Sequence, residues 1–253
     1  MRRLCACLLF LLLAIAGTGF AHEDLSRLEF KQNLGRKIPA SSRFWDERAH
    51  PVKIGDYFGR RPLVLVMGYY TCPNLCDTAL AGVIESLDRA GLKAGRDYRG
   101  LFVSINPREG PPEAAARKHE QVSAASSEGW SFLTGDDHAS RALAEAVGFP
   151  YEYDPREDEY VHPAGFVVVS SSGTLSRYFP GVRFEPDEVR FAIEQAARGR
   201  LGALADRLLL VCTHFDSVTG KYGSVIPNIT RALGVLFALG FVFVLFRLKN
   251  RKP

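Results

Sequence analysis

Apolar and polar residues are arranged along the chain in blocks that predict strands and helices in turn. Residues 63–70 form a continuous apolar run, which is typical of a strand buried on both faces of a sheet. Residues 76–90 place apolar side chains at helical spacing, and Gly91 is a residue type that commonly ends a helix. Residues 101–105 predict a second buried strand, which stops before Pro107. This part of the chain therefore has the order β-α-β.

A second set of elements follows the same kind of pattern. We expect helices at 112–125 and 140–147, a strand at 165–169 and its hairpin partner at 175–179. A helix at 187–197 closes the series. The intervening segments read as polar loops, among them 109–112 and 153–160.

The order of these elements predicts the fold. A β-α-β half followed by a β-β-α half is the thioredoxin arrangement. We therefore expect an α/β, thioredoxin-like domain over residues 45–200, in which helices flank a central mixed sheet. Residues 22–44 would form an N-terminal extension to it, and residues 201–227 a juxtamembrane segment.

The N-terminus has the pattern of a secretory signal peptide at residues 1–21. Two arginines follow Met1, an apolar run extends over residues 4–15, and small residues lead to Ala21. We expect cleavage after Ala21, and an uncleaved N-terminal anchor is the alternative. Cys5 and Cys7 lie inside the apolar run and would be lost with the peptide.

The C-terminus predicts a transmembrane helix at residues 228–248. Residues 232–246 carry no charge, and the flanking Arg231 can extend its charged end to the membrane interface. The basic tail at 249–253 favours a cytoplasmic C-terminus. We therefore expect a single-pass protein of the bacterial inner (cytoplasmic) membrane whose main domain is periplasmic or otherwise extracytoplasmic. A buried core helix at the chain end is the alternative.

The charge balance adds little beyond these two ends. The net charge is +4 and the sequence pI is about 8.8, but several positive residues belong to the targeting and anchoring segments. The predicted domain has no basic cluster of the kind that binds nucleic acid.

The candidate chemistry lies at Cys72 and Cys76, between the first predicted strand and its helix. Cysteines four residues apart share one face of a helix, so both thiols can reach one small ion or each other. The positive end of the helix dipole favours thiolates, which both metal binding and disulfide exchange require. A purely structural disulfide is a weaker interpretation, because so short a link closes almost no loop.

Around these cysteines the sequence resembles the Sco/SenC family of copper-binding assembly proteins for cytochrome c oxidase. The resemblance is carried by residues 64–80 (VLVMGYYTCPNLCDTAL), 102–107 (FVSINP) and 162–169 (HPAGFVVV), and it extends over about residues 45–200. Three positions depart from the usual family pattern, namely Asn74, Asp77 and Asn106.

The resemblance implies a metal site and a role. It implies that Cys72, Cys76 and His162 bind copper, as Cu(I) or Cu(II). The protein would deliver copper to the dinuclear site of cytochrome c oxidase subunit II, with other copper chaperones or thiol reductants as further partners. Soft thiolates select Cu(I) and imidazole suits Cu(II), so this set of ligands can hold both states.

Two other functions use the same cysteines. Cys72 and Cys76 as a redox-active pair would make the protein a thiol–disulfide oxidoreductase that keeps oxidase-subunit cysteines reduced, without need of His162. A peroxidase-like or redox-sensing relative would use one cysteine as nucleophile. We therefore leave open whether the protein is an enzyme.

Several further residues can be assigned only provisional roles from the sequence. Cys212 and His214 would form either an accessory site near the membrane or a buried small residue beside a surface histidine. Surface positions are expected for three histidines, namely His50, His119 and His138. His22 would become the new N-terminus after cleavage, and Met67 would be the only methionine of the mature chain.

Overall fold

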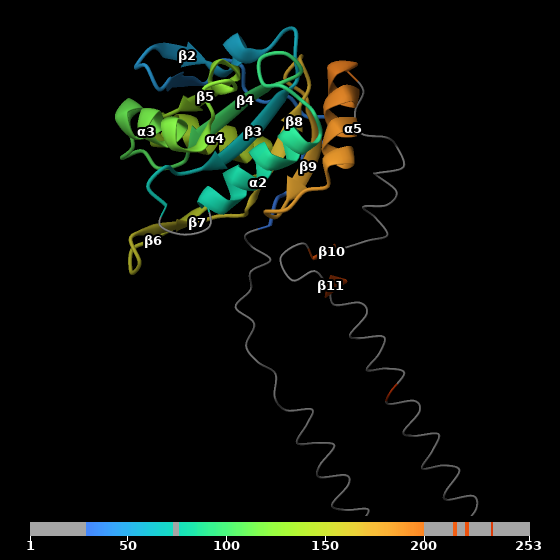
Figure 1. The fold of residues 1–253 in the computed structure, drawn as a ribbon. Coiled ribbons are helices and arrows are strands. Elements are labelled where there is room, and N and C mark those ends of the chain that lie inside the picture. The colour runs from blue at the N-terminus through green and yellow to red at the C-terminus, as the bar shows by residue number, and fades with distance from the viewer. Residues whose placement is uncertain (1–28, 73–75, 200–214, 217–220, 223–233, 235–253) are drawn as a thin grey trace, which may run out of the picture.

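A five-stranded mixed sheet forms the centre of the structure, a computed structural model that describes residues 29–72, 76–199, 215–216, 221–222 and 234 (Figure 1). The strands in sheet order are β5 (Trp130–Leu133), β4 (Arg99–Ser104), β3 (Leu63–Gly68), β8 (Gly165–Val169) and β9 (Leu175–Pro180). The pairs β3–β4 and β4–β5 are parallel, whereas β3–β8 and β8–β9 are antiparallel. This topology confirms the α/β, thioredoxin-like fold.

Helices cover both faces of the sheet, as Figure 1 shows. They are α2 (Cys76–Arg89), α3 (Pro111–Gln121), α4 (Asp137–Val147) and α5 (Pro186–Ala197). Successive residues of a strand point to opposite faces. In β3, Val64 and Val66 therefore pack in a cluster with α2, α3 and α5, while Leu65 and Met67 pack in a second cluster with α4.

The segment before β3 completes the second cluster. Ile38, Phe44 and Ile54 are buried in it, beside the hairpin of β1 (Arg43–Trp45) and β2 (Pro51–Lys53) and the short helix η2 (Ile54–Tyr57). The described part of the predicted N-terminal extension thus packs against the domain.

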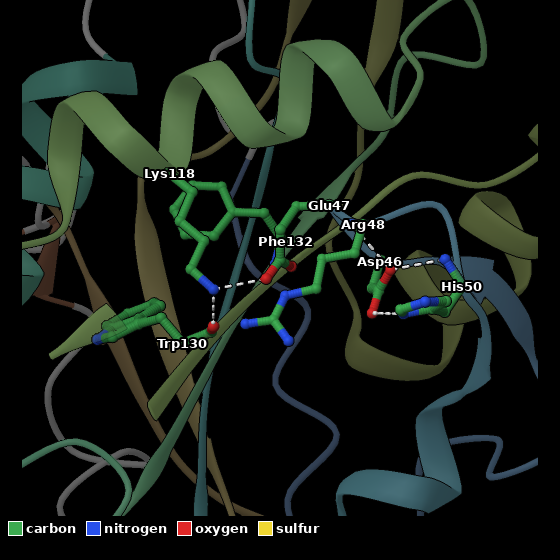
Figure 2. Close-up of polar contacts among 7 residues, drawn as sticks. All are labelled: Asp46, Glu47, Arg48, His50, Lys118, Trp130 and Phe132. Atoms are coloured by element: carbon green, nitrogen blue, oxygen red, sulfur yellow. Dashed lines mark hydrogen bonds and ion pairs between the residues drawn. The ribbon is translucent and has the colours of Figure 1, made fainter. Parts of the chain in front are cut away.

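A buried ion pair ties this N-terminal segment to the rest of the domain. The Lys118 ammonium on α3 lies 2.5 Å from the Glu47 carboxylate and also donates to the Trp130 carbonyl at 2.7 Å (Figure 2). The second oxygen of Glu47 accepts the Phe132 N–H at 3.1 Å. Glu47 therefore links α3 to β5.

Most of the elements expected from the sequence are present, with shifts of a few residues at their ends. Two were missed. The predicted polar loop at 153–160 contains an antiparallel hairpin of β6 (Glu152–Asp154) and β7 (Glu159–Val161), and β5 was not anticipated. The predicted loop at 109–112 is present at Glu109 and Gly110, although Glu109 is buried and α3 begins at Pro111, one residue before the predicted start of that helix.

The predicted targeting and membrane segments fall outside the part of the chain that the structure describes. This holds for residues 1–21 and, apart from Gly234, for residues 228–248; His22, Cys212 and His214 also lie outside it. Within the described residues, none of the helices has the length and apolar character needed to span a membrane. A short hairpin of β10 (Phe215–Asp216) and β11 (Lys221–Tyr222) is described in the predicted juxtamembrane segment.

Candidate metal centre

The first predicted ligand, Cys72, lies just beyond the end of β3. The strand ends at Gly68, and Tyr69, Tyr70 and Thr71 lead to Cys72, a buried thiol that is 7% exposed. The second predicted ligand, Cys76, is the first residue of α2, and its side chain is outside the described part of the structure. The backbone therefore has the expected order of strand, first cysteine, second cysteine and helix.

The third predicted ligand, His162, is contributed by the segment between β7 and β8. Its Nδ1 lies 2.9 Å from the Pro163 carbonyl oxygen. A carbonyl can only accept, so Nδ1 carries the proton of the neutral ring and Nε2 carries the lone pair that a metal would bind. This kind of backbone contact fixes the tautomer and orientation of metal-ligating histidines.

Aromatic rings hold the His162 imidazole in place. The Tyr69 ring packs edge-on with its centroid 5.9 Å away, and the Phe149 ring lies at 5.4 Å. Gly68 leaves room for the Phe102 ring, since a Cβ on Gly68 would lie 3.2 Å from it, while the same Cβ would be in ordinary contact with His162 Cε1 at 3.7 Å. The end of β3 and the His162 segment are thus packed together.

The pKa of His162 depends on its burial, on a hydrogen bond and on the charge of Cys72. Burial lowers the pKa of His162 from its ordinary value, while the hydrogen bond to Pro163 and the charge of a Cys72 thiolate act in the opposite direction on that pKa. The imidazole is therefore kept neutral, which is the form that coordinates metal ions. A Cys72 thiolate is thus near enough to the imidazole to influence its pKa.

A buried carboxylate, Glu109, lies beside the cysteine segment. It is 6% exposed and comes from the loop between β4 and α3. Its two oxygens accept the backbone N–H groups of Tyr70 and Thr71 at 2.9 and 2.8 Å. They also accept the hydroxyls of Ser104 and Thr71 at 2.6 and 2.7 Å. Four hydrogen bonds thus connect Glu109 to the ends of β3 and β4.

An open pocket of about 390 Å³ adjoins this carboxylate. Its wall is formed by the ends of β3 and β4, the start of α3 and the turn between β6 and β7. Arg108 bridges the pocket to that turn, with an ion pair to Asp158 at 2.9 Å and its guanidinium 5.3 Å from the Tyr153 ring centroid. The hairpin, which projects from the domain (Figure 1), is thereby held next to the cysteine segment.

Of the three predicted ligands, the structure describes the side chains of Cys72 and His162, and the His162 ring packs against Tyr69 in the segment that leads to Cys72. Among the described residues no group of three or more His, Cys, Asp and Glu side chains could hold a metal ion, and the Cys76 side chain is not among them. The surface positions expected for His50, His119 and His138 are confirmed. Met67 is buried, 4% exposed, in the second core cluster.

Sequence reasoning missed Glu109 altogether. In the sequence it stands alone between Arg108 and Gly110, in a segment rich in glycine and proline that reads as a solvent-exposed loop. Its partners Tyr70 and Thr71 are far upstream, and only the pairing of β3 with β4 brings them close.

Comparison with known proteins identifies relatives of this chain. The model of the SCO1/SenC family matches residues 31–198. None of the curated proteins matches. Among solved structures, one protein of Aquifex aeolicus superimposes with a TM-score of 0.60 at 20% identity, covering 66% of this chain and 96% of its own.

Two further structures are similar over the same region. Arabidopsis thaliana ScoI with copper bound has a TM-score of 0.53 at 16% identity, covering 66% of this chain and 99% of its own. BsSco, described as a member of the Sco family of cytochrome c oxidase assembly proteins with a disulfide switch, has a TM-score of 0.52 at 18% identity, covering 65% of this chain and 95% of its own. At such identities these likenesses show the fold.

Proposed function

Because this chain belongs to the SCO1/SenC family, we propose that it is a copper-handling assembly factor of cytochrome c oxidase. It takes up one copper ion at Cys72, Cys76 and His162 and passes it to the dinuclear copper site of oxidase subunit II. The observation that carries the proposal is the packing of the His162 imidazole against Tyr69, three residues before Cys72, together with the influence of a Cys72 thiolate on the pKa of His162.

The donor set suits copper as cargo. Two thiolates stabilise Cu(I), and the imidazole adds a ligand that also suits Cu(II). Zinc would more often have a fourth protein ligand to complete a tetrahedron. A three-ligand site leaves a coordination position through which an incoming ligand of the acceptor can attach before the donor ligands leave.

The solved relatives support the cargo and the partner. Copper is bound in Arabidopsis ScoI, and BsSco is described as belonging to a family of oxidase assembly proteins. We extend both properties to this chain on the strength of the family match and of the packing of His162 against the segment that leads to Cys72.

The proposal includes a location. The signal-peptide pattern at 1–21 and the apolar stretch at 228–248 with its basic tail place the domain outside the cytoplasmic membrane, anchored by its C-terminus. This is the compartment side on which the copper site of an oxidase subunit II would meet the domain. Other copper chaperones or thiol reductants would load the site or keep its cysteines reduced.

A thiol–disulfide oxidoreductase is the second candidate function. It is supported by the placement of Cys72 and Cys76 at the junction of β3 and the N-terminus of α2, and by the disulfide switch described for BsSco. Disulfide exchange moves two electrons and a mixed disulfide between sulfur atoms, so it does not need an imidazole ligand.

The variant His162→Ala separates the two functions. In a copper carrier it removes the ligand that holds Cu(II), so we expect Cu(II) binding and oxidase assembly to be lost while dithiol–disulfide cycling persists. Cu(II) and Cu(I) affinities are measured by competition with chelators and cycling by thiol titration, with the double variant Cys72→Ser, Cys76→Ser as the control that should lose copper binding and cycling. Normal oxidase assembly in His162→Ala cells would favour the reductase.

A further inference from the structure

We propose that Glu109 is a positioning residue of the copper site, which rests on the proposed function of that site. Its carboxylate fixes the backbone that leads to Cys72 and so sets where the thiol stands relative to His162. No pattern in the sequence marks Glu109 for this role, and the inference comes from its contacts.

The hydrogen bonds of Glu109 converge on the two residues before Cys72. Oε2 accepts the Tyr70 N–H at 2.9 Å, and Oε1 accepts both the N–H and the hydroxyl of Thr71 at 2.8 and 2.7 Å. One carboxylate thus replaces the sheet partners that these two peptide groups would have if β3 continued. The chain leaves β3 through Tyr70 and Thr71, where the backbone N–H groups bond to Glu109.

The same carboxylate is held in place from β4. The Ser104 hydroxyl, at the end of that strand, donates to Oε2 at 2.6 Å. The ladder between the two strands extends one bond further, from the Ile105 N–H to the Gly68 carbonyl at 2.8 Å. Glu109 is therefore anchored to the rigid centre of the sheet.

A cation secures the other end of the Tyr70 backbone. Arg117 on α3 donates to the Tyr70 carbonyl oxygen, so the Tyr70 backbone is bonded at its N–H to Glu109 and at its carbonyl to Arg117. A side chain on each side leaves this backbone little freedom to rotate. Cys72 follows two residues later and inherits that orientation.

Burial explains why the arrangement is strong. At 6% exposure the carboxylate has little contact with water, and an unsatisfied buried polar group is costly. The charge of Glu109 also reaches Tyr70: burial first, and then this charge, raise the pKa of the Tyr70 hydroxyl well above its ordinary value.

Glu109 is therefore expected to hold Cys72 in position before copper binds. Metal sites bind tightly when surrounding residues hold the ligands in the bound geometry, and changes to such outer residues typically cost about 10–100-fold in affinity. Glu109 does this for Cys72, as the Pro163 carbonyl does for His162.

The test uses Glu109→Gln in the full chain. The amide can accept with one oxygen only, and its NH₂ group faces the donors that the lost oxygen served. We expect Cu(I) affinity, measured by chelator competition, to fall about 10–100-fold. In the metal-free protein we expect faster hydrogen exchange at the Tyr70 and Thr71 amides and a shifted reduction potential of the Cys72–Cys76 pair.

Two control variants separate positioning from general effects. Glu113→Gln removes a carboxylate from the same pocket, where its bond is to the Gly110 N–H at 2.8 Å, and it should leave affinity unchanged. Glu47→Gln disrupts the buried pair with Lys118 and destabilises the domain elsewhere. Copper affinity that fell equally in Glu47→Gln and Glu109→Gln would overturn the proposal.

A second pair of variants covers the case in which Glu109→Gln does not fold. Thr71→Val removes only the hydroxyl bond to Glu109, and Thr71→Ser restores it. We expect weaker copper binding and a shifted cysteine potential in the first and recovery in the second. Equal behaviour of the two would contradict the role of Glu109.

A wild-type protein that binds no copper would instead contradict the proposed function. The hydrogen exchange of the Tyr70 and Thr71 amides and the reduction potential of the cysteine pair, both measured without metal, would still decide on Glu109.

Discussion

At the scale of single residues, the side chain of Tyr70 packs in the core while its backbone belongs to the candidate metal centre. Its backbone belongs to the turn that leads to Cys72, but its side chain points into the core between Phe102 and Phe132. The hydroxyl lies 2.9 Å from the Phe102 carbonyl and 2.7 Å from that of Leu133. The side chain thus joins β4 to β5, while the backbone serves the candidate metal centre.

This division predicts the behaviour of Tyr70→Phe. The ring packing is kept and one buried hydrogen-bond donor is lost, so we expect the free energy of unfolding to fall by about 1 kcal/mol. Copper affinity should be unchanged, because the bond from the Tyr70 N–H to Glu109 remains. Urea denaturation and chelator competition measure the two quantities. A tenfold loss of affinity would show that the hydroxyl also acts on the site.

At the scale of elements, the buried pair of Lys118 and Glu47 holds α3, β5 and the N-terminal segment together. Both side chains are about one tenth exposed, at 9% and 11%. The neighbouring turn is organised separately: Asp46 accepts the N–H groups of Arg48 and His50 at 2.9 and 2.7 Å, as Figure 2 shows.

We expect Glu47→Ala to lower the free energy of unfolding by about 3–5 kcal/mol, because it leaves the Lys118 ammonium buried without its counter-charge. The double variant Glu47→Ala, Lys118→Met should recover part of that loss, since no charge is then buried alone. Thermal or urea unfolding of the single and double variants checks this. A double variant less stable than the single one would mean that the hydrogen bond of Lys118 to Trp130, and not the ion pair, dominates.

The elements also show what a sequence can predict. β3 and α2 could be predicted because six consecutive buried residues and a regular helical spacing leave a clear pattern. β5 is only four residues long, and β6 and β7 alternate charged residues with tyrosines, so neither leaves a pattern that differs from a loop. Cys72 and His162 could be proposed from motifs, whereas Glu109 depends on a long-range contact.

At the scale of the whole molecule, the two chain ends predict how the domain is placed. We expect an alkaline phosphatase fusion after Ala205 to be active, since that enzyme folds only outside the cytoplasm, and a fusion after Pro253 to be inactive. Enzyme activity in intact cells is the measurement, with immunoblots to confirm equal amounts of both fusions. An inactive fusion after Ala205 would refute the extracytoplasmic placement and, with it, delivery to subunit II.

The pairing of β3 with β8 also sets when the copper site can exist during synthesis. The register places Val66 opposite Phe166, so strands from opposite ends of the domain must meet before His162 is near Cys72. A chain synthesised only as far as α4 contains both cysteines but not the imidazole. Non-local pairings of this kind form late in folding, and metal binding at such a site is coupled to folding. Capture of copper by the three proposed ligands would therefore have to wait until β8 has paired with β3.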